Sequence, residues 1–147
     1  MFTIKNIANR DVVIRGLEIV NRRSVNTLVT IYTRAGSIEE LGDAALNPEG
    51  WNIIYQSEKL GETMRLLDLG HFASEVRIGS GQAQSFYIHS AKSLMYGKNN
   101  NTANEMISKI TQQDGAIEIL EGRVLRGLFR LPIGYGKWDG VVKYDMN

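Results

Sequence analysis

The residues best suited to binding chemistry lie in one basic and apolar segment near the end of the chain. Arg123, Arg126 and Arg130 occur there among leucines and Phe129, and Tyr135 follows between two glycines. Guanidinium groups grip phosphates, sulfates and carboxylates through paired hydrogen bonds. Arginines and aromatic rings are also enriched at the centres of protein interfaces. The segment therefore has three open interpretations: a covering loop with solvated arginines, a protein contact, or an anion site.

Tyr135 offers a different chemistry. A ring between two glycines on a loop is the best candidate for an exposed aromatic platform, and such rings stack on sugars in many sandwich proteins. Trp51 and Trp138 are expected in the core instead, because a domain of this composition needs its largest rings there. A polar loop also carries the acceptor sequence that begins at Asn100, which matters only if the chain is exported by a eukaryote.

The sequence gives little support for a catalytic site or a metal site. His71 and His89 are the only histidines and are far apart in the sequence, so a zinc site would need carboxylates that no spacing supplies. Ser85 and Ser90 lie near His89 only along the strand, which does not build a serine triad. With no cysteine there is no thiol nucleophile or disulfide. We predict a protein that is not an enzyme and that needs no cofactor or metal.

The composition limits the number of domains and the kinds of partner. The 147 residues are 43% hydrophobic and 22% charged, with a net charge of +1, which suits a single globular domain spanning residues 1–147. So small a net charge gives no global attraction to nucleic acid or to an acidic membrane. No segment approaches the roughly 18–20 apolar residues of a membrane helix, and the N-terminus lacks the apolar run of a secretory signal. We expect no nucleic-acid partner and no membrane insertion.

Alternating apolar and polar residues dominate the chain and predict the elements that carry these side chains. Residues 12–20 form one expected strand, in which Gly16 suits a bulge. Trp51, Ile53 and Tyr55 are expected on one face of another strand. Turn signals recur about every ten residues, which is typical of an antiparallel sandwich or jelly roll. The sequence predicts an all-β, jelly-roll-like sandwich of about eight to ten short strands.

Two segments have helical spacing. Residues 37–46 begin with Ser37 as an expected N-cap, followed by Glu39 and Glu40, which we interpret as surface charge that compensates the helix dipole. Residues 102–111 place Met106 and Ile110 on one face behind a threonine cap. Each segment is too short to be stable without packing. We therefore expect one or two short helices beside the sheets.

The order of these motifs resembles a β-sandwich module that is abundant in diatom proteins and present in some bacterial ones. The similar stretches include the first strand, the Thr30-Ile31-Tyr32-Thr33 strand, the Gln84-Ser85-Phe86-Tyr87 strand and Trp138-Asp139-Gly140, and together they span the chain. The chain departs from the module at Gly79, where the family has proline, at Glu39 and Glu40, where it is glycine-rich, and throughout residues 123–136.

The resemblance implies a secreted or cell-surface sandwich, often repeated in tandem, without known catalytic residues. The expected function is a non-catalytic structural or interaction module that self-assembles or forms scaffolds through surface loops and strand edges. Its partner would be another protein or a second copy of the chain. The alternative is a carbohydrate-binding, lectin-like sandwich with a glycan as ligand. The residues expected to make contact are Arg123, Arg126, Phe129, Arg130 and Tyr135.

Overall fold

The computed structural model describes residues 1–20, 26–60, 66–90, 96–98, 110–125, 127–130, 132–138 and 140–147. The strands formed by these residues are β1 (Phe2–Asn6), β2 (Val12–Val20), β3 (Asn26–Ala35), β4 (Asn52–Leu60), β5 (Leu66–Ile78), β6 (Ala83–Ser90), β7 (Tyr96–Lys98), β8 (Ile110–Gln113), β9 (Ile117–Leu120), β10 (Gly122–Leu125), β11 (Pro132–Trp138) and β12 (Gly140–Met146). The helical segment consists of α1 (Ile38–Leu41) and the 3-10 helix η1 (Gly42–Leu46).

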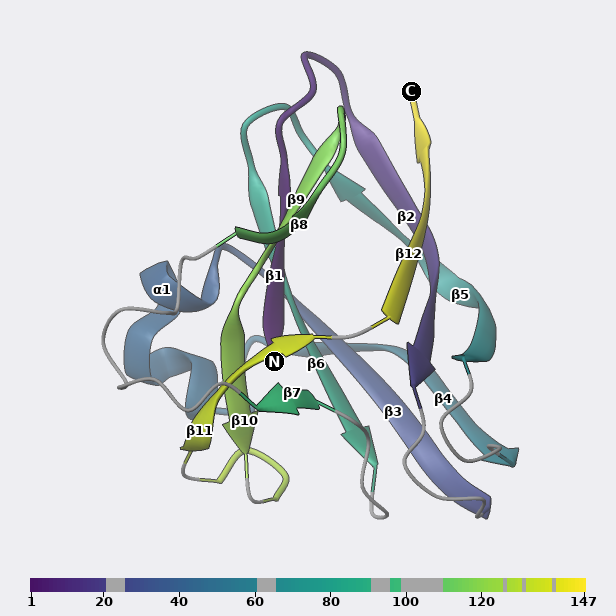
Figure 1. The fold of residues 1–147 in the computed structure, drawn as a ribbon, viewed down its shortest axis with the longest axis vertical. Coiled ribbons are helices and arrows are strands. Elements are labelled where there is room, and N and C mark those ends of the chain that lie inside the picture. The colour runs from purple at the N-terminus through teal and green to yellow at the C-terminus, as the bar shows by residue number, and fades with distance from the viewer. Residues whose placement is uncertain are drawn as a thin grey trace.

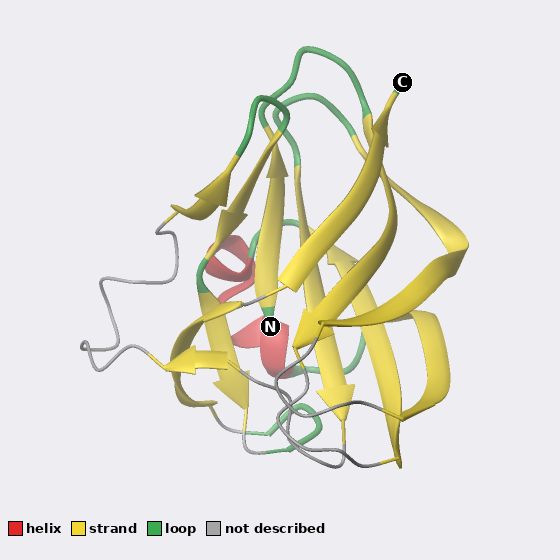
Figure 2. Cartoon of the chain, turned by 45° about the vertical axis from the view of Figure 1, so that its right-hand side comes forward, coloured by secondary structure: helices red, strands yellow, loops and turns green. Residues whose placement is uncertain are grey.

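The strands build an antiparallel β-sandwich, which confirms the predicted fold class (Figures 1 and 2). One sheet has the order β4-β3-β6-β1-β9-β8 and the facing sheet has the order β12-β2-β5. A third small sheet, β10-β11-β7, lies at the lower end of the molecule in Figure 1. The described residues form more strands than expected, because the segment predicted as a loop at residues 123–136 is itself a pair of strands.

The main core fills the space between the two larger sheets. Phe2 on β1 stacks on Trp138 with ring centroids 4.4 Å apart, and on Phe86 at 5.6 Å. Phe86 and Ile88 point into this core from one face of β6. Trp138, also expected in the core, is only 2% exposed. The first and last thirds of the chain thus meet in one apolar cluster.

A second apolar cluster covers the other face of the six-stranded sheet. Tyr87 and Trp51 pack there with Met1 and with Ile38 of α1, beneath the helical segment and the β10–β11 hairpin. Because β6 is covered on both faces, three consecutive residues are buried: Phe86, Tyr87 and Ile88. The helical segment and the hairpin are therefore held to the sandwich by apolar contacts.

The predicted bulge in β2 is present. The register with β5 shifts on both sides of Gly16, and the register with β12 skips one β2 residue at the same place. A Cβ atom at Gly16 would lie 2.2 Å from the carbonyl oxygen of Gly70. Glycine is required there because the two backbones approach too closely for any side chain.

The prediction that Trp51, Ile53 and Tyr55 share one face of a strand was wrong. Ile54 is buried in the main core whereas Ile53 is 55% exposed. The pairing with β3 skips Ile54, since Ile31 is opposite Tyr55 and Tyr32 is opposite Ile53. This bulge interrupts the alternation, so Trp51, Ile53 and Tyr55 do not share a face.

The helix predicted at residues 37–46 is confirmed as the pair α1 and η1. Ser37 is its N-cap: its Oγ accepts a hydrogen bond from the Glu40 amide at 3.1 Å, and the Glu40 carboxylate accepts one from the Ser37 amide at 2.8 Å. This reciprocal capping box satisfies two amide donors. Of the second predicted helix, residues 102–109 lie outside the described residues, while Ile110 begins strand β8.

Candidate functional site

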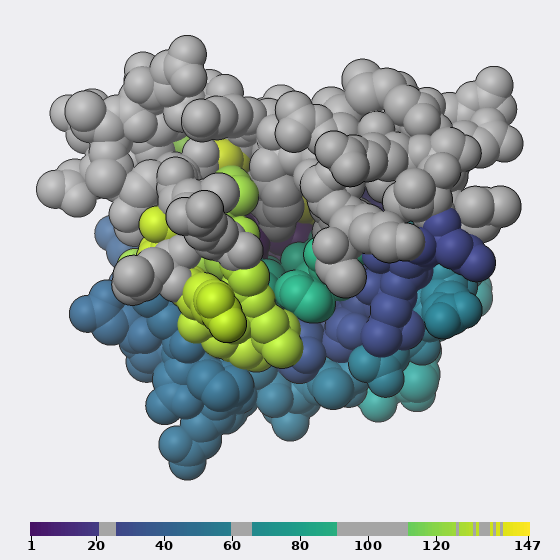
Figure 3. Space-filling model, turned by 90° about the horizontal axis from the view of Figure 1, so that it is seen from below, coloured from purple at the N-terminus to yellow at the C-terminus, as the bar shows by residue number. Residues whose placement is uncertain are grey.

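The segment at residues 123–136, predicted as a contact loop, is instead a hairpin. β10 pairs with β11 from Gly122 opposite Gly136 to Leu125 opposite Pro132, and the turn closes through a hydrogen bond from the Arg130 amide to the Gly127 carbonyl. The hairpin escaped prediction because Gly134 and Gly136 resemble turn residues, although both lie in β11. Seen from below, the hairpin (yellow-green) lies between the helical segment (blue) and the end of β6 (teal) (Figure 3).

Two of the predicted contact residues attach this hairpin to the sandwich. Arg123 is buried, and its Nη1 donates to the Gly42 carbonyl at 2.8 Å. The Phe129 ring packs edge-on against Tyr87 and Tyr32, with centroids 5.0 and 5.3 Å apart. Arg123 therefore differs from the exposed position that we expected.

The other three predicted residues are placed differently. Arg130 is exposed at the hairpin turn, next to the exposed side chain of Leu128. Arg126 and the side chain of Tyr135 lie outside the described residues, as does the Asn100 acceptor sequence. Arg130 is thus the one predicted contact residue whose described side chain faces solvent.

The amino group of Met1 lies inside the second cluster. It donates to the carbonyl oxygen of Arg123 at 2.7 Å, a contact between residues 122 positions apart. Burial lowers the pKa of this amine from 8.0 to about 5. Burial also lowers the pKa of His89, whose ring lies beside Tyr87. Both groups are bases that the folded chain holds preferentially in the neutral form.

These two shifts predict a pH-dependent stability. Between the folded and unfolded pKa values, the unfolded chain binds protons that the folded chain excludes, so the contribution is complete above pH 8 and is lost as the pH falls toward 5. We expect the free energy of unfolding, measured by urea titration, to be higher at pH 8 than at pH 5.5. The variant His89→Gln should remove only the part of this slope near pH 6.5, and a flat profile in the unsubstituted chain would contradict the prediction.

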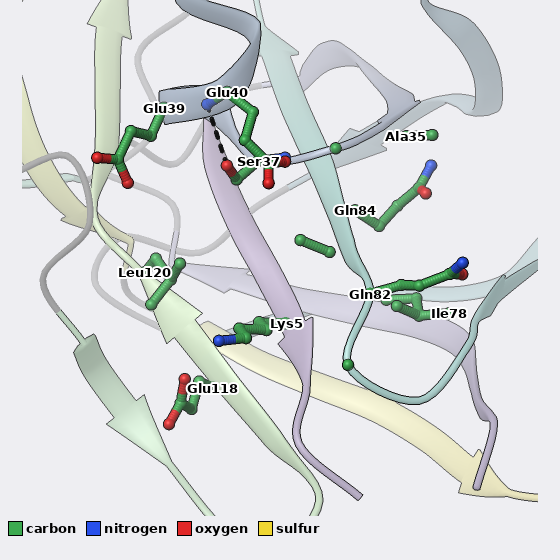
Figure 4. A pocket seen from close by; sticks show the side chains of 13 residues that line it. Lys5, Ala35, Ser37, Glu39, Glu40, Ile78, Gln82, Gln84, Glu118 and Leu120 are labelled. Atoms are coloured by element: carbon green, nitrogen blue, oxygen red, sulfur yellow. Dashed lines mark hydrogen bonds between the residues drawn. The ribbon is translucent and has the colours of Figure 1, made fainter. Parts of the chain in front are cut away.

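A polar groove lies on the outer face of the six-stranded sheet, beside α1 (Figure 4). Its volume is about 710 Å³. Lys5 on β1 is opposite Glu118 on β9, and Glu39 of α1 also lines the groove. Glu40 also lines the groove, but its carboxylate is occupied in the capping box. The groove offers an amine, carboxylates and amides to a polar ligand.

Sequence reasoning missed this groove for a physical reason. Its walls come from β1, β9, the start of β6 and the helical segment, which only the sheet order brings together. Glu39 and Glu40 were recognised, but as surface charge. No pattern in the sequence relates Lys5 to Glu118, because their pairing depends on the register between β1 and β9.

The outer face of the β12-β2-β5 sheet carries a network of ion pairs. Lys143 on β12 contacts Asp68 on β5 at 2.7 Å and Glu18 on β2 at 2.9 Å. These hydrogen bonds raise the pKa of Lys143, the bond to Asp68 most. Arg15 on β2 contacts Asp145 on β12 at 2.7 Å. Charged side chains thus line the solvent face of β12 up to its free edge.

The inner face of β12 borders a second, smaller cleft. Val142 and Tyr144 pack against the main core, and the Tyr144 hydroxyl donates to Asp114 at 2.6 Å, across the gap to the turn between β8 and β9. Burial and this hydrogen bond raise the pKa of Tyr144 to about 12. The cleft between β12 and the β8–β9 pair has a volume of about 230 Å³, and Ile117 and Ile119 contribute to its lining.

The histidines do not come together. His71 is exposed on β5 and His89 is half-buried on β6, in different sheets. Within the part of the chain that the structure describes, no three His, Asp or Glu side chains are grouped to hold a metal ion. No helix in that same part has the length and apolar character needed to cross a membrane.

Comparison with known proteins adds no relative. Neither the family models nor the curated proteins nor the solved structures gave a match to this chain. The resemblance to the diatom and bacterial module stays a prediction.

Proposed function

We propose that this chain is a non-catalytic interaction module that assembles with copies of itself through the free edge of β12. Among the residues that the structure describes, the two larger sheets have four edge strands: β4, β8, β12 and β5. A bare edge presents unpaired backbone groups to any other strand, and proteins commonly blunt such edges with bulges. The edges of this sandwich differ sharply in that respect.

Three of the four edges are irregular. The bulge in β4 lies at Ile54, and the pairing of β8 with β9 skips Thr111. β5 is interrupted around Gly70, which has a φ of 79°, and again between His71 and Val76. Each of these irregularities bends or twists its edge away from a straight partner strand.

β12 is the exception. Its seven residues pair with β2 without a skipped position on β12, because the bulge in this pair lies in β2. β12 contains no proline and is exposed at Val141 and Met146. A regularly paired, proline-free edge with exposed apolar side chains is suited to strand addition. This contrast between β12 and the other edges is the observation that carries the proposal.

Sedimentation velocity over a wide concentration range tests it. We expect concentration-dependent self-association, weak because pairing two seven-residue strands buries little surface. Replacing Asp145 with lysine on the edge should weaken association about tenfold. Asp43→Lys is the control, since it makes the same charge change at an exposed position on η1, in the helical segment that covers the other sheet. A strictly monomeric unsubstituted chain would refute self-assembly.

A carbohydrate-binding function is the second candidate, and the polar groove is the observation that favours it. Lys5, Glu118 and Glu39 supply the donors and acceptors that hydroxyl-rich ligands need, although no aromatic ring belongs to the described lining. On a glycan array, Glu118→Gln should reduce any signal at least about tenfold, since a bond to a charged group contributes about 1.5–3 kcal/mol. The variant Glu58→Gln, at an exposed position on β4, should leave the signal unchanged.

A further inference from the structure

We infer that two copies pair their β12 strands antiparallel about a two-fold axis that passes beside Tyr144. This inference rests on the proposed self-assembly and specifies its partner and register. A perpendicular two-fold axis between edge strands keeps each residue on its own face of the joined sheet. Opposed residues must therefore both face the core or both face solvent, so the axis falls beside one residue of β12.

Charge separates the possible registers. With the axis beside Tyr144, Lys143 of one copy lies opposite Asp145 of the other, and this pair occurs twice. An axis beside Lys143 would place two ammonium groups opposite one another, and an axis beside Asp145 would do the same with two carboxylates. Like charges directly opposite destabilise strand pairing, whereas opposite charges stabilise it.

The Tyr144 register also extends the ion pairs already present on this face. Asp145 is bonded to Arg15, and Lys143 to Glu18 and Asp68. Bringing Asp145 of one copy beside Lys143 of the other joins the two networks across the contact. Acidic and basic groups then alternate from one copy to the next.

The inner face supports the same register. Met146 is 45% exposed, although it lies on the same face as the core-packed Val142 and Tyr144. The Tyr144 register places Met146 of each copy opposite Val142 of the other. Val142 and Ile119 line the cleft of about 230 Å³ along this edge. The partner's exposed methionine would thus reach a recess whose lining includes Val142, Ile117 and Ile119. An axis beside Val142 would leave it opposite Trp138, beyond the end of β12.

Disulfide cross-linking of single-cysteine variants tests the register directly, since the natural sequence has no cysteine. The chains Val142→Cys, Lys143→Cys and Tyr144→Cys are oxidised under native conditions and separated without reductant. Only opposed residues, with Cβ atoms about 4.5–5.5 Å apart, come near disulfide geometry. Residue 143 would lie about 7–8 Å from its own copy on the diagonal. The two copies of residue 142 would be offset by four positions, or about 13 Å, along the strand direction.

We expect Tyr144→Cys to give at least about fivefold more cross-linked dimer than either other variant. Dominant cross-linking at 142 or 143 would overturn this register while leaving edge assembly standing. Concentration-dependent assembly with no cross-link at any of the three positions would overturn the β12 contact. A monomer at every concentration would overturn the proposed function as well.

A charge exchange tests the pairing without cysteine and without altering Tyr144. Chains with Asp145→Lys and chains with Lys143→Glu should each self-associate at least about tenfold more weakly than the natural chain. Mixed in equal amounts, they should form a heterodimer, because both opposed pairs then carry opposite charges. Absence of a heterodimer from two folded chains, whose folding is checked by circular dichroism, would overturn the proposed register.

Discussion

Replacing Trp138 with alanine is expected to lower the free energy of unfolding by about 3–5 kcal/mol. The ring is 2% exposed and stacks on Phe2, with an angle of 6° between the ring planes. Removing it would leave a large cavity where β11 ends and would strip Phe2 of its closest aromatic partner. Urea unfolding followed by far-ultraviolet circular dichroism measures the loss.

Two variants serve as controls for Trp138. Trp138→Phe keeps a ring on Phe2 and should cost less than half as much. Ile53→Ala removes an apolar side chain that is 55% exposed and should change stability by no more than about 0.5 kcal/mol. If Trp138→Ala were as mild as Ile53→Ala, the central position of the tryptophan stack would be wrong.

Replacing Gly122 with alanine should cost about 3 kcal/mol or more, although it adds a single methyl group. The added Cβ would lie 1.9 Å from the carbonyl oxygen of Met1 and 2.8 Å from the Cα atom of Phe2. Both are backbone atoms, so neither can rotate away. Relief requires β10 to move from β1, which would also strain the hydrogen bond between the Met1 amine and Arg123.

Gly115→Ala is the matched control. A Cβ at Gly115 would meet no atom within 4 Å. The same chemical change there should therefore be nearly neutral or slightly stabilising, because alanine restricts the unfolded chain. Equal melting temperatures for the two variants would show that β1 and β10 are not in close contact in solution.

The strands and the helical cap could be predicted because their signals are local. The capping box of Ser37 and Glu40 depends on residues three positions apart, and the glycine that marks the bulge in β2 can be seen in the sequence itself. The wrong face predicted for Tyr55 has the opposite origin. A bulge at Ile54 moves every later side chain of β4 to the opposite face of the sheet. The apolar and polar pattern of that segment does not indicate the bulge.

The candidate contact residues show the same limit. The arginine- and leucine-rich composition of residues 123–136 identified an unusual segment, but not which of its side chains face solvent. Arg123 is buried because Met1 and Gly42 contact it from distant parts of the chain. Phe129 packs inward because Tyr32 and Tyr87 form a surface for it. Arg130 alone has a described side chain at the exposed position expected from the sequence.

By itself, the sequence determined that this chain is an all-β sandwich, and it identified Trp138 as part of the core. Alternation and turn spacing act over ten residues or fewer, so they are readable without the fold. Only the tertiary structure decided that β12 would be the regular free edge, or that Lys5 would lie opposite Glu118 in a groove. Those features depend on which distant strands become neighbours, and the long-range packing of the sheets sets that order.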